Sequence, residues 1–391
     1  DVERGLDLML RQEKVDLRPI WFGDPDDPDV VAAFERPSAQ HPALFILEMA
    51  MARLLLRWGF EPTALIGHSL GENTAACLAG VLSYEDALGL VALRGRLFDR
   101  AEPGGMLSVA ADPATLVARL GPDLALAAVN APEQCTVSGP REAIDALAAA
   151  LDADGMDAHV VPIDIAAHSA LVEPLLEPFE AYLRSIELHP PKIPFASNRT
   201  GTWITDAEAV DPAYWAGHLR STVRFADNVR TVLGEGRRFV LEAGPGRILS
   251  SLVKLSDSTV APRVAPTMRH AREDTADDDV LLTAWEGLGS SRRARMLRDT
   301  ARAVVGRHGG RFPDDPETLF EYDAIVLDVV EAKFFSEDQK SLLQKFVSLR
   351  GGGLLMLGGQ ESVAAGEYDR TPIGEMLPVY LDYVNELPEA E

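Results

Sequence analysis

The stretch Ala64-Leu65-Ile66-Gly67-His68-Ser69-Leu70-Gly71 decides the fold of this chain and points to its chemistry. A short apolar run leads into a Gly-x-Ser-x-Gly motif, and residues 72–80 after it have the composition of a helix. A serine at such a strand-to-helix turn is typical of a nucleophile elbow, which lifts the hydroxyl clear of the sheet. The helix directs its free N–H groups and positive dipole end toward the serine. We therefore expect Ser69 to be a nucleophile, with the N–H of Leu70 stabilising the oxyanion. The alternative is an incidental serine in a glycine-rich turn, and the flanking strand and helix patterns argue against it.

Size and composition limit the classes of protein and partner. The chain has 391 residues, of which 47% are hydrophobic and 25% are charged, so it has ordinary globular composition and room for two domains. Its formal net charge of −24 argues against nucleic acids and anionic membranes as partners. We find no membrane-spanning or signal-type apolar segment, and we expect a cytoplasmic protein. The eight histidines and two cysteines show neither metal-ligand spacing nor a disulfide framework, so no metal is expected.

Helix and strand patterns alternate in the first part of the chain. They predict an α/β body made of residues 1–103 and 162–285, in which the strand 161–165 marks the return to the body. Between these segments, residues 104–161 alternate short strands with two helices, which predicts a small α+β insert. We expect helices over 42–58 and 84–100 on either side of the elbow.

The C-terminal part has a different character. A linker is expected at 286–296, and residues 297–391 are expected to form a separate module. Two apolar strands, 322–327 and 354–357, flank a helix over 336–349 that begins at Ser336, so this module contains one βαβ unit.

A nucleophilic serine needs a base and, for a charged substrate, a counter-charge. His168 follows the expected strand 161–165 and is the leading candidate for the base, although a structural loop histidine is the alternative. Arg94 lies in an otherwise apolar helix, where it forms either a structural ion pair or a two-pronged clamp for a substrate carboxylate. A serine hydrolase or thioesterase with the same elbow would instead use a late histidine, such as His270 or His308.

Several of these motifs together resemble one family. They are Gly67 to Glu72, Arg94, residues 130–132 with 137–139, residues 167–169 and residues 242–246. In this order and spacing, they resemble the acyltransferase domain of modular polyketide synthases, a relative of the malonyl-CoA:acyl-carrier-protein transacylases, over residues 1–285. The resemblance implies an α/β-hydrolase-like parallel-sheet body with a small ferredoxin-like α+β insert.

The resemblance also implies a two-step reaction. Ser69, activated by His168, takes an acyl group from a carboxyacyl-CoA while Arg94 holds the free carboxylate. The phosphopantetheine thiol of an acyl carrier protein then attacks the serine ester. A serine–histidine dyad suffices in this family, because backbone carbonyls orient the imidazole. No bound cofactor is implied, and the partners are the carrier protein and neighbouring synthase domains.

Two departures from the family pattern affect the expected activity. The family opens with a strand and a Gly-Gln-Gly-Ser-Gln-type loop that this sequence does not contain, and that loop supplies the second oxyanion donor. Its absence is expected to lower the rate by about a hundred- to a thousandfold, which leaves an inactive fragment as an alternative. At the base motif, Ile165 and Ala167 match neither the malonyl nor the methylmalonyl pattern. Ala167 leaves room for an α-substituent, whereas Leu70 favours malonyl, and we expect malonyl.

Two further features concern the tail and the surface. The strands and glycine turns of residues 295–380 resemble part of the glutamine-amidotransferase-like domains of some bacterial membrane-associated proteins. That chemistry needs a cysteine nucleophile, and both cysteines precede residue 140, so we assign the module no catalysis. An acidic carrier protein would need a basic patch, for which Arg220, Arg224 and Arg230 are candidates. A solvated helix face is the alternative for these three arginines.

Overall fold

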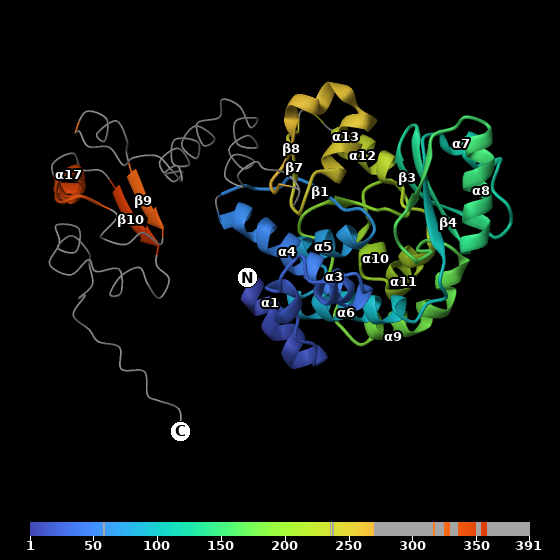
Figure 1. Cartoon of the computed structure of the whole chain (residues 1–391), viewed down its shortest axis with the longest axis horizontal. Helices are drawn as coiled ribbons and strands as arrows, with labels where there is room; N and C mark the ends of the chain where they lie inside the picture. Colours follow the sequence, from blue (N-terminus) through green and yellow to red (C-terminus); the bar gives the residue numbers. More distant parts are fainter. Residues whose placement is uncertain are drawn as a thin grey trace. The chain divides into compact units, whose positions relative to one another are not determined.

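The computed structural model describes residues 1–57, 59–234, 236, 238–269, 316, 324–328, 335–348 and 353–357. The chain divides into two units, Asp1–Gly287 and Leu288–Glu391 (Figure 1). None of the helices in the described ranges is long and apolar enough to cross a membrane.

The body of the first unit is built from helices around short parallel strands. Its elements before the insert are α1 (Val2–Leu8), a π-helical turn (Met9–Glu13), α2 (Arg18–Trp21), α3 (Pro28–Phe34), α4 (Pro37–Arg57), β1 (Leu65–Ile66), α5 (Leu70–Ala79) and α6 (Tyr84–Phe98). Those after it are a 3₁₀ turn (Ala170–Leu175), α9 (Leu176–Arg184), β6 (Phe195–Ala196), α10 (Asp206–Ala209), α11 (Pro212–Arg220), α12 (Phe225–Leu233), β7 (Val240–Glu242), α13 (Ile248–Ser256), a 3₁₀ turn (Ser258–Arg263) and β8 (Val264–Pro266).

The strands of the body pair in parallel, as expected for an α/β fold. β1 pairs with β6, and β7 pairs with β8. The helices around them bury a core whose largest fully enclosed side chains include Trp215, Phe45, Phe179 and Phe195. This burial supplies most of the driving force that holds the elbow strand and the helices against each other.

The insert is a separate small subdomain with its own core. It consists of β2 (Gly105–Val109), α7 (Pro113–Val117), β3 (Ala125–Ala131), β4 (Gln134–Gly139), α8 (Arg141–Ala153) and β5 (Ala158–Val161). The four strands form an antiparallel sheet in the order β3-β4-β2-β5, which with the two helices gives the ferredoxin-like arrangement (Figure 1). The apolar side of α8, including Ile144 and Leu151, packs on this sheet.

One sequence-based expectation about this region is wrong. The strand expected over 161–165 as the return to the body is not present. The last strand of the region, β5, ends at Val161 and pairs antiparallel with β2, so it belongs to the small subdomain. The chain from 162 to 169 is irregular. The apolar run misled because an apolar strand has the same pattern whether it closes the insert or enters the body.

The segment around Val223, which precedes α12, joins β3 of the small subdomain to the body. The Val129 N–H donates to the Val223 carbonyl at 2.9 Å, and the Val223 N–H donates to the Ala127 carbonyl at 2.8 Å. Val223 and Phe225 are fully buried with Ala128 in a small apolar cluster. These contacts fix β3 relative to the chain that leads into α12.

The second unit contains a described βαβ unit. β9 (Ala324–Asp328) and β10 (Gly353–Leu357) are parallel neighbours, and α17 (Glu337–Ser348) lies between them in sequence. Ser336 begins the helix as expected: its hydroxyl accepts from the Gln339 N–H, and the Gln339 side chain accepts from the Ser336 N–H. The linker 286–296 and most of 297–391 lie outside the described residues, and the amidotransferase-like resemblance stays a prediction.

Candidate active site

The elbow is strained at the serine itself. Ser69 has φ 51° and ψ −109°, between the end of β1 and the first residue of α5. A side chain forced into this region of backbone space stores strain that the surrounding structure must hold. The two motif glycines differ in their roles. A Cβ at Gly67 would lie 2.1 Å from the Gly71 carbonyl carbon, whereas a Cβ at Gly71 would meet nothing within 4 Å. Gly67 is therefore needed for the close approach of the chain, and Gly71 is not.

Ser69 and His168 form a hydrogen-bonded pair. The Ser69 Oγ lies 2.8 Å from His168 Nε2, and His168 Nδ1 lies 2.8 Å from the Ser221 carbonyl oxygen. A carbonyl only accepts, so Nδ1 carries the hydrogen and Nε2 is free to accept the serine proton. His168 itself has a positive φ of 62°, and its N–H donates to the Leu219 carbonyl. His168 therefore stands in an irregular segment rather than at the end of a strand.

Arg94 reaches the same hydroxyl from α6. Its Nη2 donates to Ser69 Oγ at 2.9 Å, and the side chain is almost fully buried. Its Nε and Nη1 have no hydrogen-bond partner within the described part of the chain. No carboxylate of the described residues lies within ion-pair distance of it, so the structural ion pair considered above has no partner there. The guanidinium packs over the Phe98 ring, 5.2 Å from its centroid.

Burial sets the protonation states of this group. It lowers the pKa of His168 to about 3, with the nearby Arg94 cation acting in the same direction. Burial also lowers the pKa of Arg94 to about 10, which still leaves the guanidinium charged at neutral pH. The site thus combines a neutral imidazole, able to accept a proton, with a cation beside it.

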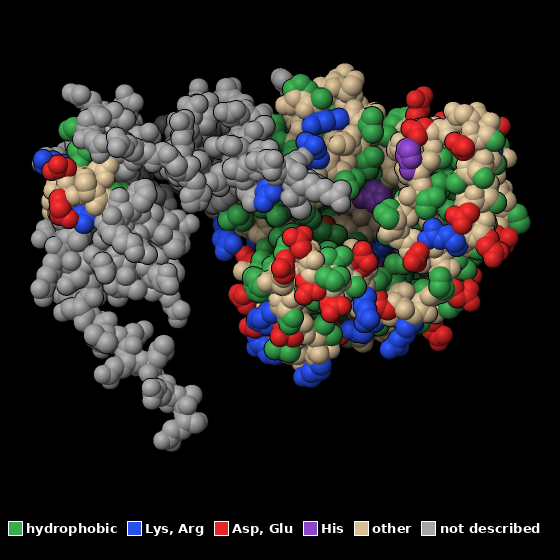
Figure 2. Space-filling model, viewed as in Figure 1, with side chains coloured by type: hydrophobic (Ala, Val, Ile, Leu, Met, Phe, Trp, Pro, Cys, Tyr) green, Lys and Arg blue, Asp and Glu red, His purple; other side chains and the backbone are tan. Residues whose placement is uncertain are grey.

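The other predicted site residues surround this pair. Leu70 is the first residue of α5, so its N–H is one of the helix N-terminal amides that have no partner within the helix. Ile165 and Ala167 are half-buried against the core of the body. His68 Nε2 lies 2.7 Å from Asn130 Oδ1 and so joins the elbow to the small subdomain. Figure 2 shows the surface hollowed between the body and the small subdomain, with a histidine side chain inside the hollow.

Sequence reasoning missed the residues that support the elbow from behind. Asn198 is fully buried, and its Oδ1 accepts the Ser69 N–H at 2.7 Å. Glu72, Tyr214 and His218 lie next to it, and Ser221 supplies the carbonyl for His168. One signal was available for Asn198, because it closely follows the strand β6, and polar side chains at the carboxyl ends of parallel strands gather at the site. The Ser221 carbonyl has no such signal, since any residue would supply it.

The candidate basic patch is largely neutralised. Arg220 Nε lies 3.1 Å from a Glu173 carboxylate oxygen. Arg224 and Arg230 both pair with Asp227, each at 2.8 Å. Two carboxylates therefore oppose the three arginines, so this surface carries little net positive charge.

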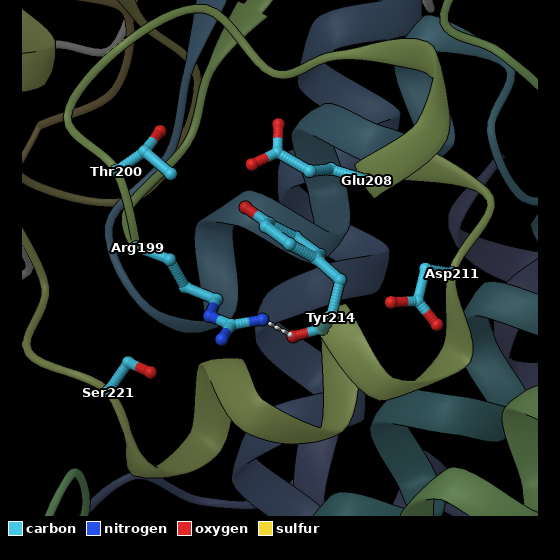
Figure 3. A pocket seen from close by; sticks show the side chains of 6 residues that line it. All are labelled: Arg199, Thr200, Glu208, Asp211, Tyr214 and Ser221. Atoms are coloured by element: carbon cyan, nitrogen blue, oxygen red, sulfur yellow. Dashed lines mark hydrogen bonds between the residues drawn. The ribbon is translucent and has the colours of Figure 1, made fainter.

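A cavity of about 280 Å³ lies against two of the supporting residues, Tyr214 and Ser221. Figure 3 shows its lining, which comprises Arg199, Thr200, Glu208, Asp211, Tyr214 and Ser221. The Arg199 guanidinium donates to the Tyr214 carbonyl at 2.9 Å. Ser69, His168 and Arg94 are not among its lining residues.

Comparison with known proteins identifies the family. The model of the acyl transferase domain matches residues 9–284. The chain belongs to the acyl transferase domain family. It is 38% identical over 258 residues, 66% of this chain, to a phenolphthiocerol/phthiocerol polyketide synthase of Mycobacterium tuberculosis. It is 37% identical over 267 residues to the spectinabilin polyketide synthase system protein NorB of Streptomyces orinoci. The matched regions are 17% and 12% of those relatives' lengths.

Solved structures of acyltransferases share the fold. The acyl transferase domain of SpnD, solved in complex with 2-(pent-4-yn-1-yl)malonyl, aligns with a TM-score of 0.69 and 40% identity, covering 77% of this chain and 70% of that one. Malonyl-CoA:acyl carrier protein transacylase (FabD) from Xanthomonas oryzae aligns with a TM-score of 0.61 and 26% identity, covering 68% of this chain and 85% of that one. The α/β-hydrolase-like body with a ferredoxin-like insert is therefore confirmed, as is membership of the acyltransferases.

Proposed function

We propose that this chain transfers a malonyl-type acyl group from coenzyme A, through an ester on Ser69, to the phosphopantetheine thiol of an acyl carrier protein. In the first step, Ser69 Oγ attacks the thioester carbonyl while His168 Nε2 takes its proton. The carbon–sulfur bond breaks, and the CoA thiolate leaves with the proton from His168. In the second step, the carrier thiol gives its proton to His168 and attacks the ester. The carbon–oxygen bond breaks, and Ser69 regains its proton.

The observation that carries this proposal is the state of Arg94. Burying an arginine is costly unless its N–H groups are bonded, and two of its nitrogens lack partners among the described residues. The third nitrogen donates to the nucleophile. A carboxylate on the acyl group would bond the free nitrogens in the two-pronged way that guanidinium favours, while the thioester carbonyl lies at Ser69. A simple hydrolase of uncharged esters has no use for such a cation.

The extender unit is the finer part of the proposal. Leu70 follows the nucleophile and favours malonyl, whereas the small side chain of Ala167 gives space for an α-substituent. A single methyl contact changes specificity by only about 1–3 kcal/mol, so competition between substrates is the relevant measure. We propose malonyl as the preferred unit.

The test is to load the protein with malonyl-CoA and to follow the mass of the intact chain. The expected result is a malonyl ester on Ser69 that persists until an acyl carrier protein with its phosphopantetheine arm is added. Acetyl-CoA and methylmalonyl-CoA, mixed in equal amounts with malonyl-CoA, should load more slowly. Rapid release of free malonate without accumulation of the ester would instead favour the thioesterase alternative.

The same experiment addresses the inactive-fragment alternative. A serine-reactive fluorophosphonate reports whether Ser69 is nucleophilic without requiring any acyl-CoA. If neither reagent modifies Ser69, the chain should be tested again with a family-type N-terminal segment added, and recovery of loading would support that alternative. The two histidines considered for a hydrolase, His270 and His308, lie outside the described residues, whereas His168 is already bonded to Ser69.

A further inference from the structure

Behind the nucleophile lies a buried polar group that the proposed reaction does not use. We propose that Asn198 is a positioning residue for Ser69: its side-chain amide holds the strained elbow, and Glu72 holds Asn198. The effect of Asn198 on the acyl-transfer reaction rests on the proposed function. That Asn198 positions Ser69 is argued from the geometry alone.

The amide of Asn198 spans the elbow. Its Oδ1 accepts the Ser69 N–H at 2.7 Å, and its Nδ2 donates to the Gly67 carbonyl at 2.8 Å. Both ends of the side chain are therefore bonded to backbone groups on either side of His68. The residue is fully buried, so no water competes for these bonds. A side chain that bonds two points of a strained turn resists its relaxation toward ordinary backbone angles.

Glu72 fixes Asn198 in turn. Its Oε2 accepts the Asn198 N–H at 2.7 Å, and its Oε1 accepts the Tyr214 hydroxyl at 2.8 Å. His218 Nε2 lies 3.4 Å from Glu72 Oε2 and 3.4 Å from Asn198 Oδ1. Both neighbours are acceptors, so this nitrogen carries the hydrogen and donates to them. The carboxylate is fully buried and comes from α5, the helix that begins just after the nucleophile.

Burial and nearby charges set the protonation states in this network. The ionisable groups that act on Glu72 are Tyr214, Arg199 and Glu208, with His218 close by. Burial raises the pKa of Glu72 to about 7, and the bonds from Asn198 and Tyr214 act in the opposite direction. Burial also holds the pKa of His218 well below its ordinary value, so that ring is neutral.

The network has a consequence for the oxyanion. Because the Ser69 N–H is already committed to Asn198, the first amide available to a developing oxyanion is that of Leu70, at the start of α5. The same bond holds Ser69 at the angle that places its Oγ 2.8 Å from His168 Nε2. Asn198 thereby acts on the reaction through the nucleophile and touches no substrate atom.

The experiment compares Asn198→Ala and Asn198→Asp with Asn228→Ala. Asn228 is an equally buried asparagine on α12 whose side chain has no hydrogen-bond partner within the described residues, so it controls for the loss of a buried amide. The number of reactive serines is titrated with a fluorophosphonate, and kcat and KM for malonyl loading are expressed per titrated site. We expect Asn198→Ala to lower kcat by about a hundredfold, with KM changed by less than about threefold, because a misplaced nucleophile loses rate rather than binding.

Asn198→Asp keeps an acceptor for the Ser69 N–H but removes the donor to the Gly67 carbonyl and adds a negative charge near His168. That charge stabilises protonated imidazole, so the acidic limb of the loading rate should move to higher pH. A purely structural role would lower the titrated fraction and the midpoint of unfolding and would leave the per-site kcat of Asn198→Ala unchanged. That outcome, or an effect of Asn228→Ala as large as that of Asn198→Ala, would overturn the proposal.

Failure of the proposed function is distinguishable from failure of this inference. If the wild-type chain reacts with the fluorophosphonate but not with malonyl-CoA, the function is wrong. The rate of fluorophosphonate reaction at Ser69 then replaces kcat when the Asn198 variants are compared with Asn228→Ala and wild type. An unchanged rate in Asn198→Ala would overturn the positioning role in that case too.

Discussion

Arg94 Nη2 donates to Ser69 Oγ at 2.9 Å, although the two residues come from different elements and Arg94 is nearly fully buried. The cation therefore stands beside the candidate nucleophile before any substrate is bound. The Arg94 cation helps to lower the pKa of His168, the candidate base. Two of its guanidinium nitrogens have no partner among the described residues, so a substrate carboxylate could bond them.

Replacing Arg94 should change the choice of substrate. In Arg94→Ala, loading of malonyl-CoA should fall by about a hundredfold or more, because a charge-assisted two-pronged bond is lost. Loading of acetyl-CoA should be reduced far less, so the preference between the two inverts. Arg94→Lys keeps the charge without the planar fork and should recover only part of the malonyl rate. The ratio of malonyl to acetyl loading is measured by intact mass when the two thioesters compete. An unchanged preference in Arg94→Ala would refute the assignment of Arg94 as the carboxylate clamp.

Removing the base should stop ester formation without unfolding the chain. His168→Gln is expected to lower the rate of Ser69 acylation by about 10²–10⁴-fold, the usual contribution of a general base. The amide retains some of the hydrogen bonding that His168 makes with Ser69 and Ser221. His159→Gln, at an exposed histidine of β5, is the matched control and should react like wild type. Stopped-flow release of CoA measures both variants.

The acid side of the pH profile should be unusual for a histidine base. Because burial and Arg94 lower the pKa of His168 to about 3, the imidazole stays unprotonated through the range where an ordinary histidine becomes charged. The rate of fluorophosphonate reaction at Ser69 should therefore show no histidine-type decline as the pH falls from 7 to about 5.

Arg94→Ala removes the cation, so the pKa of His168 should rise and the decline should begin at higher pH. Rates measured over this range in both proteins test the effect, and a wild-type inflection near the ordinary histidine value would contradict it.

The two motif glycines should respond in opposite ways to substitution by alanine. At Gly67, a Cβ would lie 2.1–2.3 Å from backbone atoms of Gly71 and Glu72, which have no room to move. Gly67→Ala should therefore destabilise the fold by several kcal/mol or yield little folded protein, an effect of about 3 kcal/mol or more. Gly71→Ala meets nothing and lies within α5, so it should be neutral or slightly stabilising. Urea unfolding of the pair measures the difference, and equal stabilities would refute this account of the turn.

A half-buried carboxyl outside the site should make stability depend on pH. The carboxyl of Glu48 on α4 accepts from the Thr74 hydroxyl at 2.6 Å, and burial, together with the nearby Glu242, raises its pKa to about 7. The folded state therefore holds a proton that the unfolded chain has already released above its ordinary pKa. The contribution to stability is complete below about pH 4.5 and is lost as the pH rises through about 7.

Glu48→Gln removes this dependence because the amide stays neutral. At pH 8 the variant should be more stable than wild type by about 1–3 kcal/mol, and near pH 4.5 the two should converge. Glu177→Gln on α9 removes one charge from an exposed position and should have little effect at either pH. Urea midpoints are measured for both variants and wild type at about pH 4.5 and pH 8. The same difference between Glu48→Gln and wild type at both pH values would contradict the raised pKa of Glu48.

Local patterns in the sequence were sufficient to predict the general architecture, and they singled out Ser69 as the candidate nucleophile. The elbow is a local motif, since its strand, turn and helix are contiguous, and it predicted Ser69 directly. The α/β body and the small α+β insert also followed from alternating patterns of a few residues each. The error over 161–165 arose because an apolar run fits equally well as the last strand of the insert or as a strand of the body. The choice between them depends on which strand it pairs with, and that partner, β2, lies far away in the chain.

The sequence by itself determined the elbow, the family resemblance and the candidate residues Arg94 and His168. Only the tertiary structure brought these side chains to one hydroxyl, placed the Ser221 carbonyl behind the imidazole and set Asn198 and Glu72 against the elbow. It also showed that the strain lies at Ser69, with Gly67 and not Gly71 needed for the approach. The physical reason is that a local motif fixes backbone geometry over a few residues. Burial, hydrogen-bond satisfaction and protonation depend instead on groups far apart in the sequence, which meet only when the core is packed.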